Sequence, residues 1–173
     1  LSPGPCAATF NAGDADVKGL ELEVEAHPVD GMTIDASFSK LDFEYTRLVP
    51  NTGLTVGQKA PGIIEDKWSI GAQHEFTLAS GASITPRIDH VYQGGFNTNA
   101  VFTGSNRVAG YGLTNARISW KSADAGWDVA LIAANLTNEL YYLSNFDLLS
   151  SSGAQYGLLG APREYSLQVK KKF

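Results

Sequence analysis

Strict alternation between apolar and polar residues is the feature that most constrains this chain. In the segment 16–27, Leu20, Leu22 and Val24 lie on one side of an extended chain, and three glutamates lie on the other. A period of two is typical of a β-strand with one apolar face, whereas an amphipathic helix repeats every 3.6 residues. The pattern recurs in seven segments, which we predict as strands: 16–27, 32–47, 67–78, 82–92, 111–121, 127–142 and 163–173.

The connections between these strands fall into two length classes. The first, third and fifth strands are followed by tight turns, and the second, fourth and sixth by long loops, 48–66, 94–109 and 143–160. If neighbouring strands are antiparallel, the sheet carries its short turns at one end and its long loops at the other. Transmembrane β-barrels of bacterial outer membranes have this asymmetry, with short periplasmic turns and longer extracellular loops.

The lengths of the strands also favour a membrane barrel. The predicted strands span 11 to 16 residues, whereas a strand needs about 9–11 to cross a bilayer and soluble strands average about 5–6. The longest unbroken apolar run, Val129–Ala134, excludes a transmembrane helix, which needs about 20 such residues. The acidic composition, with a net charge of −5, argues against a nucleic-acid partner. Cys6 is the single cysteine, so there is no disulfide framework.

Two strands contain irregularities. In the second, the apolar phase of 32–38 changes to the opposite phase over 41–45, which we interpret as a β-bulge near Ser39–Lys40 or as the strand leaving the apolar zone. In the fourth, Pro86 cannot donate a ladder hydrogen bond and is unexpected in a central strand.

Aromatic residues are placed near both ends of the predicted strands. Trp68 begins the third strand from the loop side, and Trp120 and Trp127 flank the turn after the fifth. Trp and Tyr concentrate at both membrane–water interfaces of barrels. We therefore predict an aromatic girdle of Trp68, Tyr92, Trp120, Trp127, Tyr141 and Tyr142.

Three motifs resemble segments of TonB-dependent outer-membrane receptors. The run 17–23, VKGLELE, resembles a mid-barrel strand, and Asn135–Glu139 followed by Tyr141 resembles the penultimate strand with the loop after it. The run 160–167, GAPREYSL, with the terminal Phe173, resembles the last strand. The resemblance covers roughly 11–173 and implies an all-β, antiparallel up-and-down meander of about seven long strands, part of a 22-stranded transmembrane β-barrel.

This resemblance also implies that residues 1–173 are the C-terminal segment of the barrel, without the plug domain and the earlier strands. We expect a fragment or processed product for two further reasons: the chain begins with Leu1 rather than Met, and seven strands fall short of the even count of at least eight in single-chain barrels. The implied function is uptake of a scarce solute, such as an iron–siderophore complex, across the outer membrane of a Gram-negative bacterium. The implied partners are outer-membrane lipid, the rest of the barrel and plug, TonB through the plug, and the barrel-assembly machinery. The assembly signal would comprise Tyr165, Leu167, Val169 and Phe173, read by β-augmentation.

The residues alone leave a second fold and function open. A soluble β-sandwich that binds a carbohydrate-like ligand would also alternate, although it would not explain the long strands. We expect no enzymatic activity, no cofactor and no metal site, because no GxSxG, HExxH, P-loop or GxGxxG frame is present. The row Glu21, Glu23 and Glu25 has the residue type of a general acid/base pair, but we interpret it as a polar lumen wall.

Ligand contacts are expected on the extracellular loops, whose amide and aromatic side chains suit a polar or sugar-like solute. The candidate residues are Phe96, Asn97, Asn99, Phe102, Asn106, Asn145 and Phe146.

Overall fold

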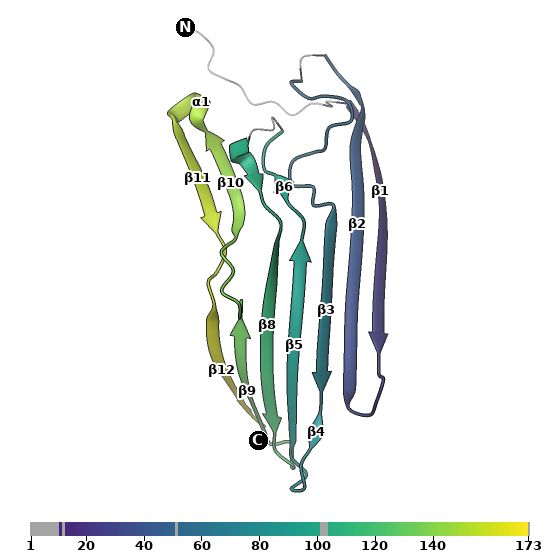
Figure 1. The fold of residues 1–173 in the computed structure, drawn as a ribbon, viewed down its shortest axis with the longest axis vertical. Coiled ribbons are helices and arrows are strands. Elements are labelled where there is room, and N and C mark those ends of the chain that lie inside the picture. Colours follow the sequence, from purple (N-terminus) through teal and green to yellow (C-terminus); the bar gives the residue numbers. More distant parts are fainter. Residues whose placement is uncertain (1–10, 12, 51, 101–103, 173) are drawn as a thin grey trace.

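A single curved antiparallel sheet makes up most of the molecule. The computed structural model describes residues 11, 13–50, 52–100 and 104–172. Seven long strands follow one another in chain order across this sheet (Figure 1): β1 Gly13–Ala26, β2 Met32–Leu48, β3 Asp66–His74, β5 Ser83–Gln93, β8 Tyr111–Lys121, β9 Trp127–Ala134 and β12 Glu164–Lys171. The short strand β4, Phe76–Thr77, pairs with β5. The predicted all-β meander is confirmed.

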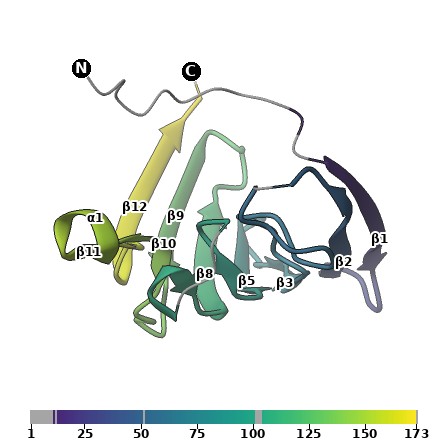
Figure 2. The same ribbon diagram turned by 90° about the horizontal axis from the view of Figure 1, so that it is seen from above.

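The sheet is a single layer that curves into an arc, with β1 and β12 at its two ends (Figure 2). Neither end strand pairs on its outer edge with another described strand, so the described residues form an open wall. No second sheet covers the apolar face among the described residues, as the β-sandwich alternative would require.

Strand register gathers the alternating residues into rows that cross the sheet. Leu131 of β9, for example, lies between Ile118 of β8 and Leu167 of β12. These apolar side chains face away from the protein, with Leu131 54% and Leu167 68% exposed. Apolar rows of this length, uncovered by protein, are what the lipid-facing side of a membrane barrel presents.

The connections have the predicted asymmetry in length. The short turns 27–31, 78–82 and 122–126 lie at one end of the sheet, and the long connections 49–65, 94–110 and 135–163 lie at the other (Figure 1). The long connections contain structure of their own. β6 Phe96–Asn97 pairs with β7 Arg107–Val108 around the 3-10 turn η1 Gly104–Asn106, and β10 Tyr142–Leu148 pairs with β11 Ala154–Leu159 around α1 Leu149–Ser152.

The sixth strand is shorter than predicted, and the loop after it is more regular. The strand β9 ends at Ala134 rather than near Tyr142, because Asn135 and Asn138 adopt left-handed backbone conformations with φ of 47° and 56°. Asn tolerates this region better than most residues. The chain then resumes as the β10–β11 hairpin, so the predicted loop 143–160 is mostly β-structure.

Of the two interpretations of the phase change near Ser39–Lys40, the β-bulge is wrong. The β1–β2 register runs without a shift through these residues and shifts instead between Asp14 and Ala15, opposite Arg47 and Tyr45. The phase change therefore marks the strand leaving the apolar zone, since the β2–β3 pairing ends at Lys40 and Asp66. Pro86 is accommodated in β5 because the hydrogen-bond ladder to β3 and β4 is interrupted opposite it. The interruption lies between the pairs Gln73–Arg87 and Phe76–Ile84.

Candidate functional site

The polar rows form the concave side of the sheet. Glu25, Asp35, Gly71, Asp89 and Asn115 are successive partners across five strands, from β1 to β8. The hollows of the wall are lined by side chains of such rows, so this side is the one that would face the lumen of a closed barrel. The acidic row of β1 lies here, as predicted for a polar wall.

An arginine network spans the centre of the concave wall. Arg87 of β5 donates hydrogen bonds from Nη1 to Asp35 Oδ1 at 2.8 Å and from Nη2 to Asp35 Oδ2 at 3.1 Å. The same Nη2 group contacts Asp89. Gly71 lies between the two carboxylates, where an added Cβ would come within 2.4 Å of Arg87 Nη2. The glycine therefore leaves the space through which Arg87 reaches across β3.

A second arginine reaches in the opposite direction. Arg117 is the cross-strand partner of Arg87, but its guanidinium nitrogens lie 3.2 and 3.3 Å from Gln168 Oε1 on β12. The two cations thus point away from each other, which reduces the repulsion that like charges in facing positions would cause. Together they connect β2 to β12 along the wall.

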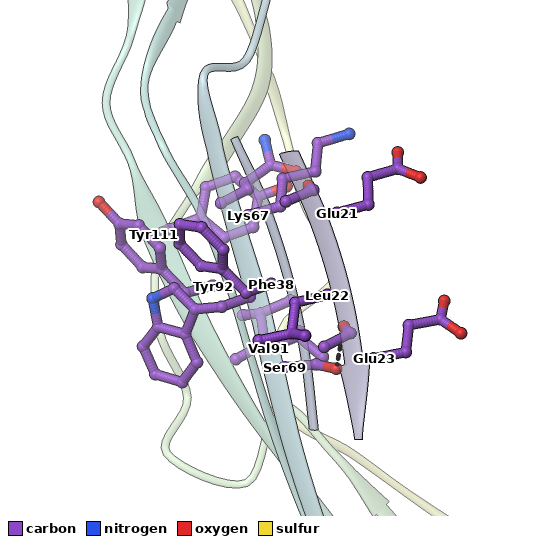
Figure 3. Close-up of a pocket in the computed structure, with 14 residues that line it drawn as sticks. Glu21, Leu22, Glu23, Phe38, Lys67, Ser69, Val91, Tyr92 and Tyr111 are labelled. Atoms are coloured by element: carbon purple, nitrogen blue, oxygen red, sulfur yellow. Dashed lines mark hydrogen bonds between the residues drawn. The ribbon is translucent and has the colours of Figure 1, made fainter. Parts of the chain in front are cut away.

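Below the long loops, the wall has a hollow of about 490 Å³. Figure 3 shows Glu21 and Glu23 projecting together from β1, with Phe38 on the opposite side of the sheet. The hollow is lined by polar side chains, including Lys67 and Tyr111, and Ser37 Oγ lies 2.8 Å from Ser69 Oγ. Apolar residues line it as well, including Leu22, Phe38 and Trp68. Carboxylates, an ammonium group and hydroxyls at one place can hydrogen-bond a polar solute.

The first and second long loops are joined above this hollow. The Gly62 amide donates to the Asn97 carbonyl at 2.8 Å, and the Gln58 side chain donates to the Ala100 carbonyl. Gln58 also accepts a bond from the Thr55 amide at 3.1 Å, which orients its side chain.

The second and third long loops are joined by a further set of bonds. Asn145 Nδ2 donates to the Arg107 carbonyl at 2.8 Å, and Gln155 Nε2 donates to the Ser105 carbonyl at 2.9 Å. Thr98 donates to the Asn145 carbonyl, and the Ser105 hydroxyl donates to Asp147. All three long loops are therefore linked, and we call the residues 49–65, 94–110 and 135–163 the loop cap.

A comparison with known protein families agrees with this fold. The family described as "TonB dependent receptor-like, beta-barrel" matches residues 2–138. The chain belongs to this family.

Solved receptor structures share the fold of this TonB-dependent receptor segment. The ferric yersiniabactin uptake receptor FyuA from Yersinia pestis has a TM-score of 0.79 at 16% identity, covering 94% of this chain and 24% of that one. The ferric preacinetobactin receptor BauA from Acinetobacter baumannii has a TM-score of 0.70 at 23% identity, covering 91% and 22%. The ferric citrate transporter FecA, unliganded, has a TM-score of 0.73 at 20% identity, covering 92% and 24%.

This chain spans about a quarter of the length of the receptors it matches. The described residues supply seven long strands of the wall, and closure of a 22-stranded barrel is what the family implies. No curated protein matches the sequence.

The predicted ligand residues of this receptor segment are distributed through the loop cap. Asn97 and Asn145 take part in the bonds between loops, and Asn106 is buried, with 1% of its surface exposed. Asn99 Oδ1 accepts a bond from the Ala100 amide at 2.7 Å. Phe96 is half-buried in β6, Phe146 is exposed on β10, and Phe102 lies outside the described residues. Their contacts with a solute stay a prediction.

The six residues predicted to form the aromatic girdle lie at three different places in the receptor wall. Trp68 and Tyr92 stack at the loop end of the apolar face, with ring centroids 5.7 Å apart. Trp120 and Trp127 are exposed near the turn end. Tyr141 packs against Tyr111, a residue of the concave rows, at 4.4 Å, and Tyr142 begins the β10 hairpin. The girdle stays a prediction.

A buried asparagine joins the receptor wall to the loop cap, and the sequence reading missed its role. Asn135 is 4% exposed, and its Nδ2 donates to the carbonyls of Glu139 at 2.9 Å and Ala161 at 3.1 Å. Its Oδ1 accepts from the Glu139 amide at 2.8 Å, and its own amide donates to Asn115 Oδ1 at 3.0 Å. The two asparagines of the 135–139 motif were the available signal, since Asn favours turns that interrupt a strand.

Three of the four residues predicted to form the assembly signal lie on β12, and that role stays a prediction. Tyr165, Leu167 and Val169 are exposed on one face of β12, and Phe173 lies outside the described residues. Among the described residues, no cluster of three or more His, Cys, Asp or Glu side chains can hold a metal ion. No helix in this part of the chain is long and apolar enough to cross a membrane.

Proposed function

We propose that this chain is the wall and loop segment of an outer-membrane receptor that takes up a scarce solute, such as an iron–siderophore complex, in a Gram-negative bacterium. One observation carries the proposal: three linked loops lie above a polar concave wall, and the opposite face of the same sheet is apolar and exposed. The printed names of three matching receptors concern ferric yersiniabactin, ferric preacinetobactin and ferric citrate, which favours a ferric chelate.

The rest of the receptor would supply the parts that drive transport. The edges of β1 and β12, unpaired among the described strands, fit the remaining strands of the barrel, because unpaired backbone groups in lipid cost several kcal/mol each. Energy would come from TonB through the plug, and the barrel-assembly machinery would insert the barrel. We assign this segment no catalytic step, cofactor or resident metal.

Uptake by the complete receptor tests the proposal. A strain that lacks the receptor is complemented with the wild-type gene and supplied with radioactive iron as catecholate, hydroxamate or carboxylate chelates. We expect energy-dependent uptake of one class and none without the gene. Wild-type and deletion strains that take up every ferric chelate equally would contradict iron uptake.

Loop variants then test where the solute binds. Phe146→Ala removes an exposed aromatic ring from β10, and Leu140→Ala removes an exposed apolar side chain from the connection just before it. We expect weaker chelate binding for Phe146→Ala alone, measured by fluorescence titration of the purified receptor. Equal effects of the two substitutions would argue against a contact at Phe146.

A further inference from the structure

The β10–β11 hairpin of the third long loop has two faces of different chemistry. On one face, Asn145 Nδ2 donates to the Arg107 carbonyl at 2.8 Å, and Gln155 Nε2 donates to the Ser105 carbonyl at 2.9 Å. Asp147, the register partner of Gln155, accepts a bond from the Ser105 hydroxyl on the same face. Arg107 and Ser105 belong to the second long loop, so this face of the hairpin lies against that loop.

The opposite face of the hairpin is apolar and exposed. Phe146 and Tyr156 are register partners on this face, and Leu158 lies opposite Ser144. The exposed fractions are 56% for Phe146, 58% for Tyr156, 56% for Leu158 and 42% for Leu148. We call these four residues the hairpin apolar face. A contiguous exposed apolar patch marks an interaction site.

The hairpin apolar face carries no charge. In the sequence 142–159, Asp147 is the one charged residue, and its carboxylate faces the second long loop. Protein interfaces that form permanently are more apolar than transient ones. A permanent contact, made when the receptor folds, therefore suits this face better than a soluble partner that binds and leaves.

The order of the strands indicates which segment of the receptor stands beside this face. The second long loop leads into β8, whereas the hairpin leads into β12, the last described strand of the arc (Figure 2). The apolar face is turned away from the second loop, and therefore toward the side of the outer edge of β12. In the closed barrel that the family implies, a further antiparallel strand pairs with this edge. Because β12 runs from the loop end to the turn end, that strand runs toward the loop end, and the connection after it emerges beside the hairpin.

We propose that the hairpin apolar face docks against the extracellular connection that follows the barrel strand paired with β12, and so joins the loops where the two ends of the barrel meet. This chain spans about a quarter of the length of the receptors it matches, so that strand and its connection belong to the rest of the receptor. A lipid fits this face less well, because the hairpin stands beyond the loop ends of β9 and β12, where the apolar face of the sheet stops (Figure 1). The inference rests on the closed barrel of the family and does not depend on which solute is taken up.

Cysteine labelling of the complete receptor on intact cells tests the inference. All native cysteines, including Cys6, are replaced by serine, and single cysteines are introduced as Leu158→Cys or, as the control, Leu140→Cys, an exposed position just before the hairpin. We expect a membrane-impermeant maleimide to label Leu158→Cys about tenfold more slowly than Leu140→Cys, because a packed side chain reacts only when its contact opens locally. Shortening the connection after the strand paired with β12 to a tight turn should restore fast labelling. Phe146 is left unchanged throughout, because its contact with a solute is tested separately.

Three other outcomes would overturn the inference. Equal labelling rates at the two positions would mean that the face stays in solvent. Protection that survives shortening of the connection would indicate lipid or a second copy of the receptor, and protection that requires added chelate would place the face in the solute site. Heat-modifiable gel migration verifies that each variant is folded, and alanine substitution of the apolar residues of the connection replaces a shortened variant that is not. Failure of the proposed function would appear separately, as absent solute uptake by a receptor in which Leu158→Cys is protected.

Discussion

Arg87 of β5 holds Asp35 of β2 by two hydrogen bonds, although β3 lies between the two strands. The contact passes over Gly71, the one position of β3 in this row. Bidentate pairing of guanidinium and carboxylate fixes both distance and orientation. The pair therefore ties together three strands, and its existence depends on a missing side chain.

Filling that space should break the pair. Gly71→Ala places a Cβ within 2.4 Å of Arg87 Nη2 and 2.7 Å of Asp35 Oδ2. We expect a loss of about 1–3 kcal/mol in the free energy of unfolding, the usual cost of overpacking. Urea unfolding of the receptor in lipid vesicles measures it. Gly104→Ala, which meets no described atom within 4 Å, is the control, and an equal effect there would contradict the proposed clash.

The face assignment predicts different costs for charges at neighbouring positions. Leu131→Arg puts a charge on the apolar face between Ile118 and Leu167, and should cost about 2–4 kcal/mol in a bilayer. Ile132→Arg points into the concave row beside Arg117 and should cost less. The free energies of unfolding of both variants, measured on the complete receptor in lipid, give the two costs. A larger cost at Ile132 would mean that the lipid-facing side has been assigned wrongly.

Asn135 should control the position of the third loop. Asn135→Ala removes the two bonds that its Nδ2 donates and the one that its Oδ1 accepts, and it puts Ala at a φ of 47°. We expect a loss of about 1–3 kcal/mol in stability and faster proteolysis within 142–159. Asn135→Gly loses the same bonds but tolerates the backbone, so it should cost less than Ala. If both variants are cleaved at the wild-type rate, Asn135 does not position the third loop.

The turn between β8 and β9 should weaken in acid. The Ser122 hydroxyl, and secondly the Gly126 amide, lower the pKa of Asp124 below its ordinary value. A carboxyl whose pKa is lower in the folded state stabilises the fold above its unfolded pKa of about 4, and this contribution disappears as the pH falls through the folded value. The stability difference between wild type and Asp124→Asn should therefore shrink below about pH 4. A difference that is constant across this range would contradict the prediction.

The end of the chain should matter for insertion rather than for stability. If Phe173 and the exposed residues of β12 form the assembly signal, deletion of Phe173 reduces the amount of folded receptor in the outer membrane. Phe173→Tyr keeps an aromatic anchor and should restore insertion. Immunoblots of outer-membrane fractions with heat-modifiable migration measure both. Wild-type levels after the deletion would argue against an assembly role.

The strands could be predicted from sequence because the direction of a side chain in an extended chain is a local property. Leu20, Leu22 and Val24 lie on one face whatever their neighbours do, and all seven long strands were found on this basis. The end of β9 was missed because Asn135 turns the chain through contacts with Asn115 and Ala161, which are distant in sequence. The alternation of apolar and polar residues also cannot reveal a register shift that depends on how two strands pair. The shift between Asp14 and Ala15, opposite Arg47 and Tyr45, is of this kind.

Less of the candidate site could be predicted from the sequence. Loop composition indicated which residue types are present but not their partners. Asn145, a predicted ligand contact, has a side chain that donates to the Arg107 carbonyl, a bond that loop composition could not reveal. The pairing of Arg87 with Asp35 could not be predicted either, because it requires the register of three strands and the absence of a side chain at Gly71.

The bonds within the loop cap limit how such a receptor can change its specificity. In the second long loop, the Asn97 carbonyl accepts a bond from the first long loop, and the Arg107 and Ser105 carbonyls accept bonds from the third. Exchange of one loop for that of a relative would leave acceptors without donors on the loops that remain. New specificities should therefore arise through recombination that transfers the segment 49–163 as a block, or through point changes at side chains such as Phe146 that take no part in these bonds.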